Sequence, residues 1–241
     1  MTKIFKYEVR RLLWNKVFIG ILVIGLCYGW MTLSRGIISG IAYTAPFSAW
    51  SFGYYLSGIV PLLCIAELFF LTFFVSSQER RVVVITSTTP VNRRRYAMAR
   101  VGAVCLGSLI FIGCIILLGF LFCWFFFREV PGAGWLLSVL IILLPAMAFC
   151  LGVGWLAGSM NSGLIYAAMG LLLVLCMLSL PRALDFSLGR FFAEYPKSLP
   201  VLDPAFSVPV DVLLGRVAYL GAGIILFVIG QLKQDKRGRE R

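Results

Sequence analysis

The chain has 241 residues, of which 61% are hydrophobic and only 13% are charged. Soluble domains carry roughly a quarter charged residues and less than half apolar ones. This composition therefore excludes a soluble globular domain, a disordered chain and a coiled coil, and it indicates a membrane protein. The net charge of +12 can indicate nucleic-acid binding. Here the basic residues lie mostly between apolar runs, so we assign them to membrane topology and expect no nucleic-acid partner.

The residue types that carry most enzyme chemistry are missing or scattered. There is no histidine, which excludes Ser-His-Asp and Cys-His catalysis and HExxH zinc sites. The seven cysteines all fall inside apolar runs without CxxC spacing, so we interpret them as small buried side chains. No lysine follows a glycine, so the chain has no Walker A loop. We therefore expect no catalytic, cofactor or metal site on this chain.

Residues 1–16 are too polar to span a bilayer, but they have an apolar stripe with helical spacing. Basic side chains lie on another face of the same helix. We expect a basic amphipathic helix along the cytoplasmic membrane surface. It either anchors to anionic lipid or transmits a push from a partner protein. The apolar stripe consists of Phe5, Val9, Leu12 and Leu13, and the basic face of Lys3, Lys6 and Arg10.

Six apolar segments follow, each close to the roughly 20 residues that a spanning helix needs. We expect one all-α transmembrane domain over residues 1–241. Helices one and two lie in 17–76, helices three to five in 101–180 and helix six in 212–232, and residues 233–241 form a tail. In the sixth segment, Arg216 is placed to reach the head groups. The segments are Val17–Leu33, Ser51–Ser76, Val101–Phe127, Trp135–Ala157, Gly163–Leu180 and Val212–Leu232.

The distribution of basic residues predicts the orientation. Sixteen of the 22 Lys and Arg residues lie in the N-terminal segment, the second connection and the C-terminal tail, and six lie elsewhere. Cytoplasmic loops carry an excess of Lys and Arg. We therefore expect both termini and the second connection to be cytoplasmic, which requires an even number of spans. Aromatic groups at Trp50, Tyr54, Tyr55 and Trp124–Phe127 fit an interfacial belt.

The connection over 77–100 is long and has an apolar centre, Val82–Ile85, between charged flanks. Pro90 restricts Thr89 to a non-helical conformation and should stop a helix there. Because four apolar residues gain little by facing water, we expect a short helix that docks into another protein. The alternative is packing on the ends of the chain's own helices.

The connection over 181–211 contains five prolines and mixes aromatic with charged residues. It is too short for a folded domain and too apolar for a mobile loop. We expect short external helices that re-enter the outer leaflet, where non-helical backbone must be covered by protein or line a wet cavity.

This layout resembles the type 2 ABC transporter permease family, the membrane half of many bacterial exporters. Glu79-Arg80, then Thr89-Pro90-Val91, then Arg93 and Arg100 are similar to the family's pattern of Glu-Arg, a small residue with Pro, and a basic residue. The resemblance implies a bacterial cytoplasmic membrane protein whose second connection is a coupling helix. It also implies a partner ABC ATPase chain that binds ATP and Mg²⁺, and a second permease subunit, identical or homologous. The implied coupling residues are Glu79, Arg80, Arg81, Val82, Val83, Val84, Ile85, Thr89 and Pro90.

Two carboxylates are candidate functional residues. Glu79 either fixes the coupling helix or pairs with a basic residue of the N-terminal helix, and the alternative is a solvated charge at a helix end. Glu67 lies deep in the second span, where a carboxylate is costly unless protonated, paired or wet. It either lines a substrate path or gate, or is a protonated side chain bonded to a neighbouring helix.

The sequence thus favours the permease subunit of an ATP-driven exporter with an amphipathic or hydrophobic cargo, such as a peptide, a lipid-linked molecule or a drug. Two alternatives stay open. A secondary transporter or channel usually needs several intramembrane ionisable residues, whereas only Glu67 is clearly intramembrane. The second alternative is a membrane scaffold or sensor that transports nothing.

Overall fold

The structure, a computed structural model, describes residues 2–75, 93–131, 134–178 and 180–239. The described part of the chain is helical and contains no strand. A π-helical turn, Leu33–Ile37, extends the helix Lys16–Thr32, and a 3₁₀ turn, Pro196–Ser198, follows the helix Gly189–Glu194. The α-helices are α1 (Thr2–Leu13), α2 (Lys16–Thr32), α3 (Ala49–Val75), α5 (Arg93–Phe127), α6 (Trp135–Met160), α7 (Leu164–Met177), α8 (Gly189–Glu194) and α9 (Val210–Arg239).

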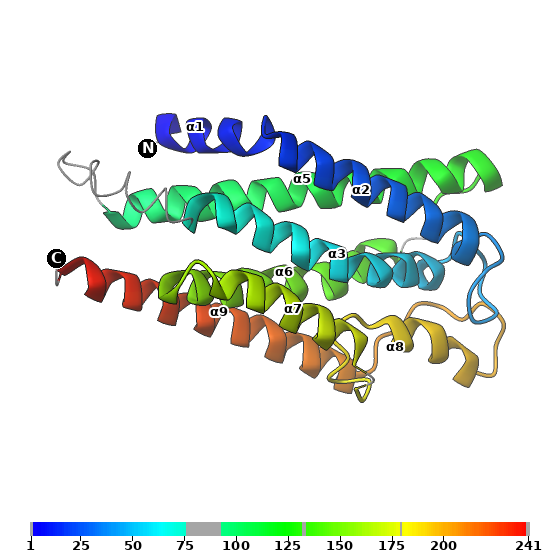
Figure 1. The fold of residues 1–241 in the computed structure, drawn as a ribbon. Helices are drawn as coiled ribbons and strands as arrows, with labels where there is room; N and C mark the ends of the chain where they lie inside the picture. The colour runs from blue at the N-terminus through cyan, green and yellow to red at the C-terminus, as the bar shows by residue number, and fades with distance from the viewer. Residues whose placement is uncertain (1, 76–92, 132–133, 179, 240–241) are drawn as a thin grey trace.

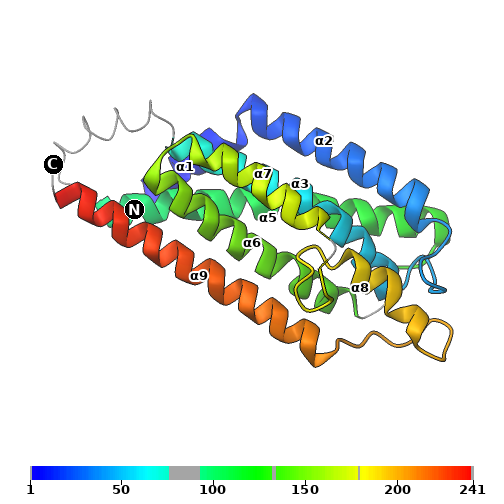
Figure 2. The ribbon, with the colours of Figure 1, turned by 60° about the horizontal axis from the view of Figure 1, so that its bottom comes forward.

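The long helices run up and down a single elongated bundle (Figures 1 and 2). Both chain termini lie at one end of it, which we call the terminal end. The last turn of α3 and the first turn of α5 lie at this end too. The opposite end carries α8 and the start of α9, and we call it the far end. The predicted even number of passes agrees with termini that share one end.

Five helices are long and apolar enough to cross a membrane: Lys16–Ile37, Ala49–Phe74, Tyr96–Phe127, Trp135–Met160 and Val210–Gln234. A multi-pass helical membrane protein is therefore confirmed. The expected fifth span over Gly163–Leu180 is a shorter helix, α7, of 14 residues. At 1.5 Å per residue it measures about 21 Å, less than the roughly 30 Å of a hydrocarbon core. The six-span layout thus stays a prediction.

Helix α3 is the centre of the bundle. It contacts α2, α5, α6, α7 and α8, and 61% of its apolar stretch is buried, against 22% for those of α2 and α9. Peripheral helices can present apolar side chains to lipid, but a central helix must fit its neighbours on all sides. Any movement of α3 would therefore reach most of the fold.

Glycines bring α6 and α9 into close contact. A side chain on Gly152 would overlap the carbonyl oxygen of Gly223, and one on Gly223 would overlap that of Ala148. Such small residues allow the backbones of membrane helices to approach. Three other glycines also pack against neighbouring helices of the chain: Gly25 faces Phe111 of α5, Gly29 faces Tyr55 of α3, and Gly154 faces Leu68 of α3.

The segment before α9 is folded onto α3 at the far end. Short helices were predicted here, and the segment contains α8 and a 3₁₀ turn, whereas its re-entry into the outer leaflet stays a prediction. Phe191 and Phe192 of α8 are fully buried and pack against Trp50 of α3. The Trp50 indole N–H donates to the carbonyl oxygen of Pro204 at 2.8 Å. Aromatic packing therefore fixes this segment to the central helix.

Two expectations need correction at the far end. Arg216 does not extend to the head groups but is 2% exposed, because its guanidinium donates to the carbonyl oxygens of Asp185 and Phe186. Trp50 and Tyr55 are also buried and do not form a surface belt; the Tyr55 hydroxyl donates to the Ile115 carbonyl at 3.0 Å. Each of these polar groups finds a backbone partner inside the protein, as burial in an apolar medium requires.

The close approach of α6 and α9 predicts that a larger side chain at their contact lowers stability. Gly152→Val should lower the free energy of unfolding by about 1–3 kcal/mol, the usual cost of overpacking, because the new side chain overlaps the Gly223 backbone. Gly113→Val is the matched control, since nothing lies within 4 Å of a side chain built at that helical glycine. Thermal unfolding in detergent measures both, and equal stability of the two variants would contradict the packing described.

Candidate functional site

The predicted coupling residues, Glu79, Arg80, Arg81, Val82, Val83, Val84, Ile85, Thr89 and Pro90, lie outside the described residues. The helices on either side are described: α3 ends at Val75 and α5 begins at Arg93. Both of these helix ends lie at the terminal end, next to α1 (Figure 1). The contacts that hold these three helix ends together are therefore the candidate site.

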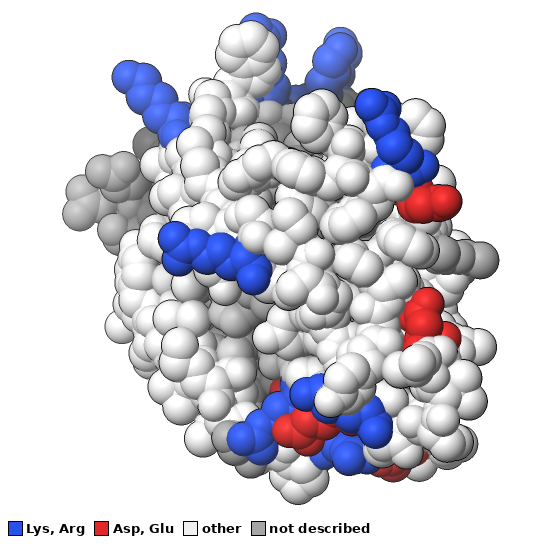
Figure 3. All heavy atoms as spheres, turned by 90° about the vertical axis from the view of Figure 1, so that its right-hand side faces the viewer, with Lys and Arg blue, Asp and Glu red and all other residues white. Residues whose placement is uncertain are grey.

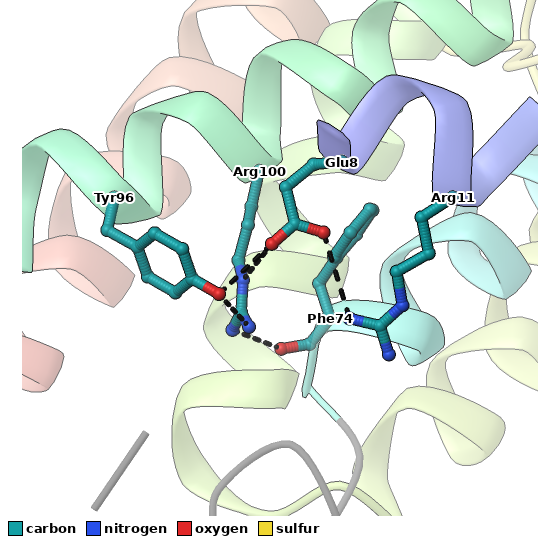
Figure 4. Close-up of polar contacts among 5 residues, drawn as sticks. All are labelled: Glu8, Arg11, Phe74, Tyr96 and Arg100. Atoms are coloured by element: carbon teal, nitrogen blue, oxygen red, sulfur yellow. Dashed lines mark hydrogen bonds and ion pairs between the residues drawn. The ribbon is translucent and has the colours of Figure 1, made fainter. Parts of the chain in front are cut away.

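A buried polar cluster joins them (Figure 4). The Arg100 guanidinium of α5 lies 3.6 Å from the Glu8 carboxylate of α1, measured from Nε to Oε1. The Tyr96 hydroxyl donates to the same carboxylate oxygen at 3.0 Å and accepts a bond from Arg100 at 2.7 Å. The side chains of Glu8 and Arg100 are 2% and 7% exposed. This cluster, Glu8, Tyr96 and Arg100, is called the junction cluster below.

The junction cluster also reaches the end of α3. Arg100 donates from Nη1 to the carbonyl oxygen of Phe74 at 3.1 Å. That carbonyl belongs to the last described turn of α3, which runs to Val75. A charged guanidinium makes a stronger hydrogen bond to a carbonyl oxygen than a neutral donor does. One side chain therefore binds α1, α3 and α5 at once.

Helical spacing explains how the members meet. Tyr96 and Arg100 are four residues apart, so they share one face of α5, and the guanidinium stacks over the Tyr96 ring at 4.3 Å. Glu8 lies between Phe5 and Leu12 on the buried face of α1. Small residues of α5 receive that face: Phe5 lies against Gly102 and Leu12 against Gly107. Apolar contact and the ion pair therefore act over the same helix pair.

Sequence reasoning included Arg100 in the second connection but missed Glu8 and Tyr96. A signal was present, because Glu8 is the only acidic residue before Glu67, among five basic residues of the N-terminal segment. Its position beside the apolar stripe also placed it on the buried face. The expected pairing of Glu79 with the N-terminal helix stays a prediction, whereas the structure gives that helix a different ionic partner, Arg100.

Glu67 lies apart from the junction cluster. It lies on α3 with no exposed surface, seven residues before Phe74, about 10 Å along the helix. Cys64 lies about one turn before Glu67 on the same helix. Within the described residues, neither carboxylate oxygen has a hydrogen-bond partner. The expected bond to a neighbouring helix is thus not seen there, and Glu67 does not line the cavity described below.

The junction cluster ties three helices together through charged and polar side chains. Among the residues described, no group of three or more Cys, Asp or Glu side chains is placed to hold a metal ion. Removing one member of a buried ion pair costs about 3–5 kcal/mol. The junction cluster can therefore keep α1 fixed to the two helix ends that border residues 76–92.

Comparison of the chain with protein-family models, with curated proteins and with solved structures finds no match.

The junction cluster predicts strong coupling between Glu8 and Arg100. Glu8→Gln and Arg100→Met should each lower the free energy of unfolding by about 3 kcal/mol, and the double variant should recover about 1–3 kcal/mol of the summed loss. Arg11→Ala is the control, because Arg11 contacts Glu8 at 3.7 Å but is 41% exposed, so about 0–1 kcal/mol is expected. Additive losses in a chemical-denaturation cycle would show that the pair is not coupled.

Glu67 makes an independent prediction. Glu67→Leu should raise the free energy of unfolding by about 1–3 kcal/mol, since it removes a buried polar group that has no partner in the described residues. Glu67→Gln should raise the free energy of unfolding by less, because an amide in the same place also needs hydrogen-bond partners. Thermal unfolding of the two purified variants distinguishes these outcomes. A destabilised Glu67→Leu variant would mean that the carboxyl group makes a stabilising interaction.

Proposed function

We propose that the chain is the permease subunit of an ATP-driven ABC exporter in a bacterial cytoplasmic membrane. It has six spans with both termini cytoplasmic, and it works as a homo- or heterodimer with a separate ABC ATPase. The cargo is amphipathic or hydrophobic. Because the chain has no Walker A loop, ATP and Mg²⁺ bind on the partner, and this chain only transmits and uses the force.

The observation that carries the proposal is the junction cluster. An ATPase that docks on residues 77–100 would pull on the last turn of α3 and the first turns of α5. Arg100 binds both of these helix ends and also the Glu8 carboxylate of α1. A displacement at the docking segment would therefore move α1 and the central helix α3 together.

The central position of α3 supports the same route. It contacts α2, α5, α6 and α7, so a shift of α3 reaches the helices that would face a second subunit. The two alternatives have less support. Across the five apolar helices of the described part, the buried charged side chains are Glu67, Arg100 and Arg216. Both arginines are bound by protein groups, which leaves one carboxylate where coupled secondary transporters usually use several ionisable groups.

Cross-linking from the coupling segment tests the proposal. A photoactivatable amino acid at Val83 should capture an ATP-binding polypeptide in the native host, since that side chain would sit in the docking groove. The same amino acid at Tyr43 is the control, because Tyr43 is 76% exposed in the loop before α3 and so lies at the far end (Figure 1). Mass spectrometry identifies the adducts. Capture from both positions, or from neither, would contradict the proposal.

A further inference from the structure

A cavity of about 440 Å³ lies near the far end, between α2, α3, α7 and the segment that forms α8. This volume falls within the roughly 300–1,000 Å³ of small-molecule sites. Helices α2 and α7 each pack against α3, with little contact between them. The cavity is therefore a recess over α3 with α2 and α7 as its walls and the start of α8 as its roof.

Small residues keep the recess open. Gly58 on α3 has only a methyl group of Thr32 within 4 Å of where its side chain would be, at 3.8 Å. Pro61 on α3 and Gly189 on α8 also line the space. At the edge, Met177 is 80% exposed and Leu178 is 49% exposed. The recess thus opens through an apolar edge on the side of the bundle that would face lipid.

The lining is rich in hydrogen-bond donors. Tyr28 of α2 and Tyr54 of α3 line the recess, and each side chain carries a phenol hydroxyl. Arg190 of α8 also lines the recess with its exposed guanidinium side chain. Two phenols and a guanidinium are suited to a ligand that offers several oxygen acceptors.

The carboxylate in the lining is already engaged. Asp185 accepts bonds from the Ser187 amide and hydroxyl at 3.1 Å and from the Arg190 amide at 3.3 Å. Behind it, Arg216 donates to the carbonyl oxygens of Asp185 and Phe186. In the lining itself the charges of Arg190 and Asp185 balance, and the buried Arg216 behind the wall brings the sum of these three charges to +1, which favours an anionic group. Basic and acidic side chains lie together on this end of the molecule (Figure 3).

We propose that this recess binds an amphiphile with a phosphate-bearing head group. The phosphate lies under α8 and accepts hydrogen bonds from Tyr28, Tyr54 and Arg190, while the acyl chain leaves along the apolar edge at Met177 and Leu178. One part of this proposal rests on the proposed function, namely that the bound amphiphile is the cargo of the exporter. Binding itself needs neither the ATPase nor nucleotide.

Photolabelling of the purified full-length chain in maltoside detergent tests this proposal. The probe is a lysophosphatidylglycerol with a diazirine in its acyl chain, and its neutral counterpart is the monoacylglycerol with the same chain. The phosphate-bearing probe should label peptides of α2, α3 and α7 about tenfold more than the neutral probe, as expected for charge-assisted hydrogen bonds. Equal labelling by the two probes would overturn the phosphate assignment.

Matched variants locate the site. Gly58→Leu fills the recess without meeting backbone and should abolish the excess labelling, whereas Gly113→Leu, with open space around it, should not. Arg190→Gln and Tyr54→Phe should each reduce labelling about fivefold or more, whereas Arg128→Gln, exposed at the same end, should not. Gel filtration confirms that each variant is folded. Unchanged labelling of both Gly58→Leu and Tyr54→Phe would overturn the proposal.

A second copy of the chain is the competing occupant. If it filled the recess, Tyr28→Cys would form cross-linked dimers efficiently and the lipid probe would not label the lining, which would also overturn the proposal. Failure of either experiment leaves the other interpretable. The labelling is done on the chain alone, whereas the Val83 cross-link reports only on the ATPase.

Discussion

A guanidinium buried in an apolar bundle must be satisfied by protein groups, and this constraint organises the terminal end of the molecule. Arg100 meets it with a carboxylate from α1, a phenol from α5 and a backbone carbonyl from α3. A buried ion pair offsets the loss of hydration only when its geometry is good and further hydrogen bonds satisfy the remaining groups. The need of one charge for several partners is therefore what ties three helix ends into a unit.

The far end repeats the principle with a different set of partners. Arg216 of α9 is buried and donates to two consecutive backbone carbonyls, and the Tyr219 hydroxyl donates to the Leu184 carbonyl before them at 2.6 Å. Asp185 of the same stretch accepts bonds from the amides at the start of α8. An irregular segment can therefore lie against the bundle, because side chains replace the hydrogen bonds that it cannot form with itself.

The two ends are linked through α3. Its last turn is bound by Arg100, its first turn packs under α8 through Trp50, and its middle forms the floor of the recess through Gly58 and Pro61. The helix is continuous from Ala49 to Val75, with Pro61 inside it. The proposed coupling at one end and the proposed amphiphile site at the other are thus connected by one continuous element.

The sequence by itself determined the membrane class, the long apolar helices and the amphipathic N-terminal helix, because composition and helical spacing are local properties. It did not reveal the partner of Glu8, the burial of Arg216 and Trp50, or the recess over α3. Each of these depends on residues far apart in the chain: 88 positions separate Glu8 from Tyr96, and 31 separate Asp185 from Arg216. Only tertiary packing decides which charges are removed from water, since it alone determines which helices become neighbours.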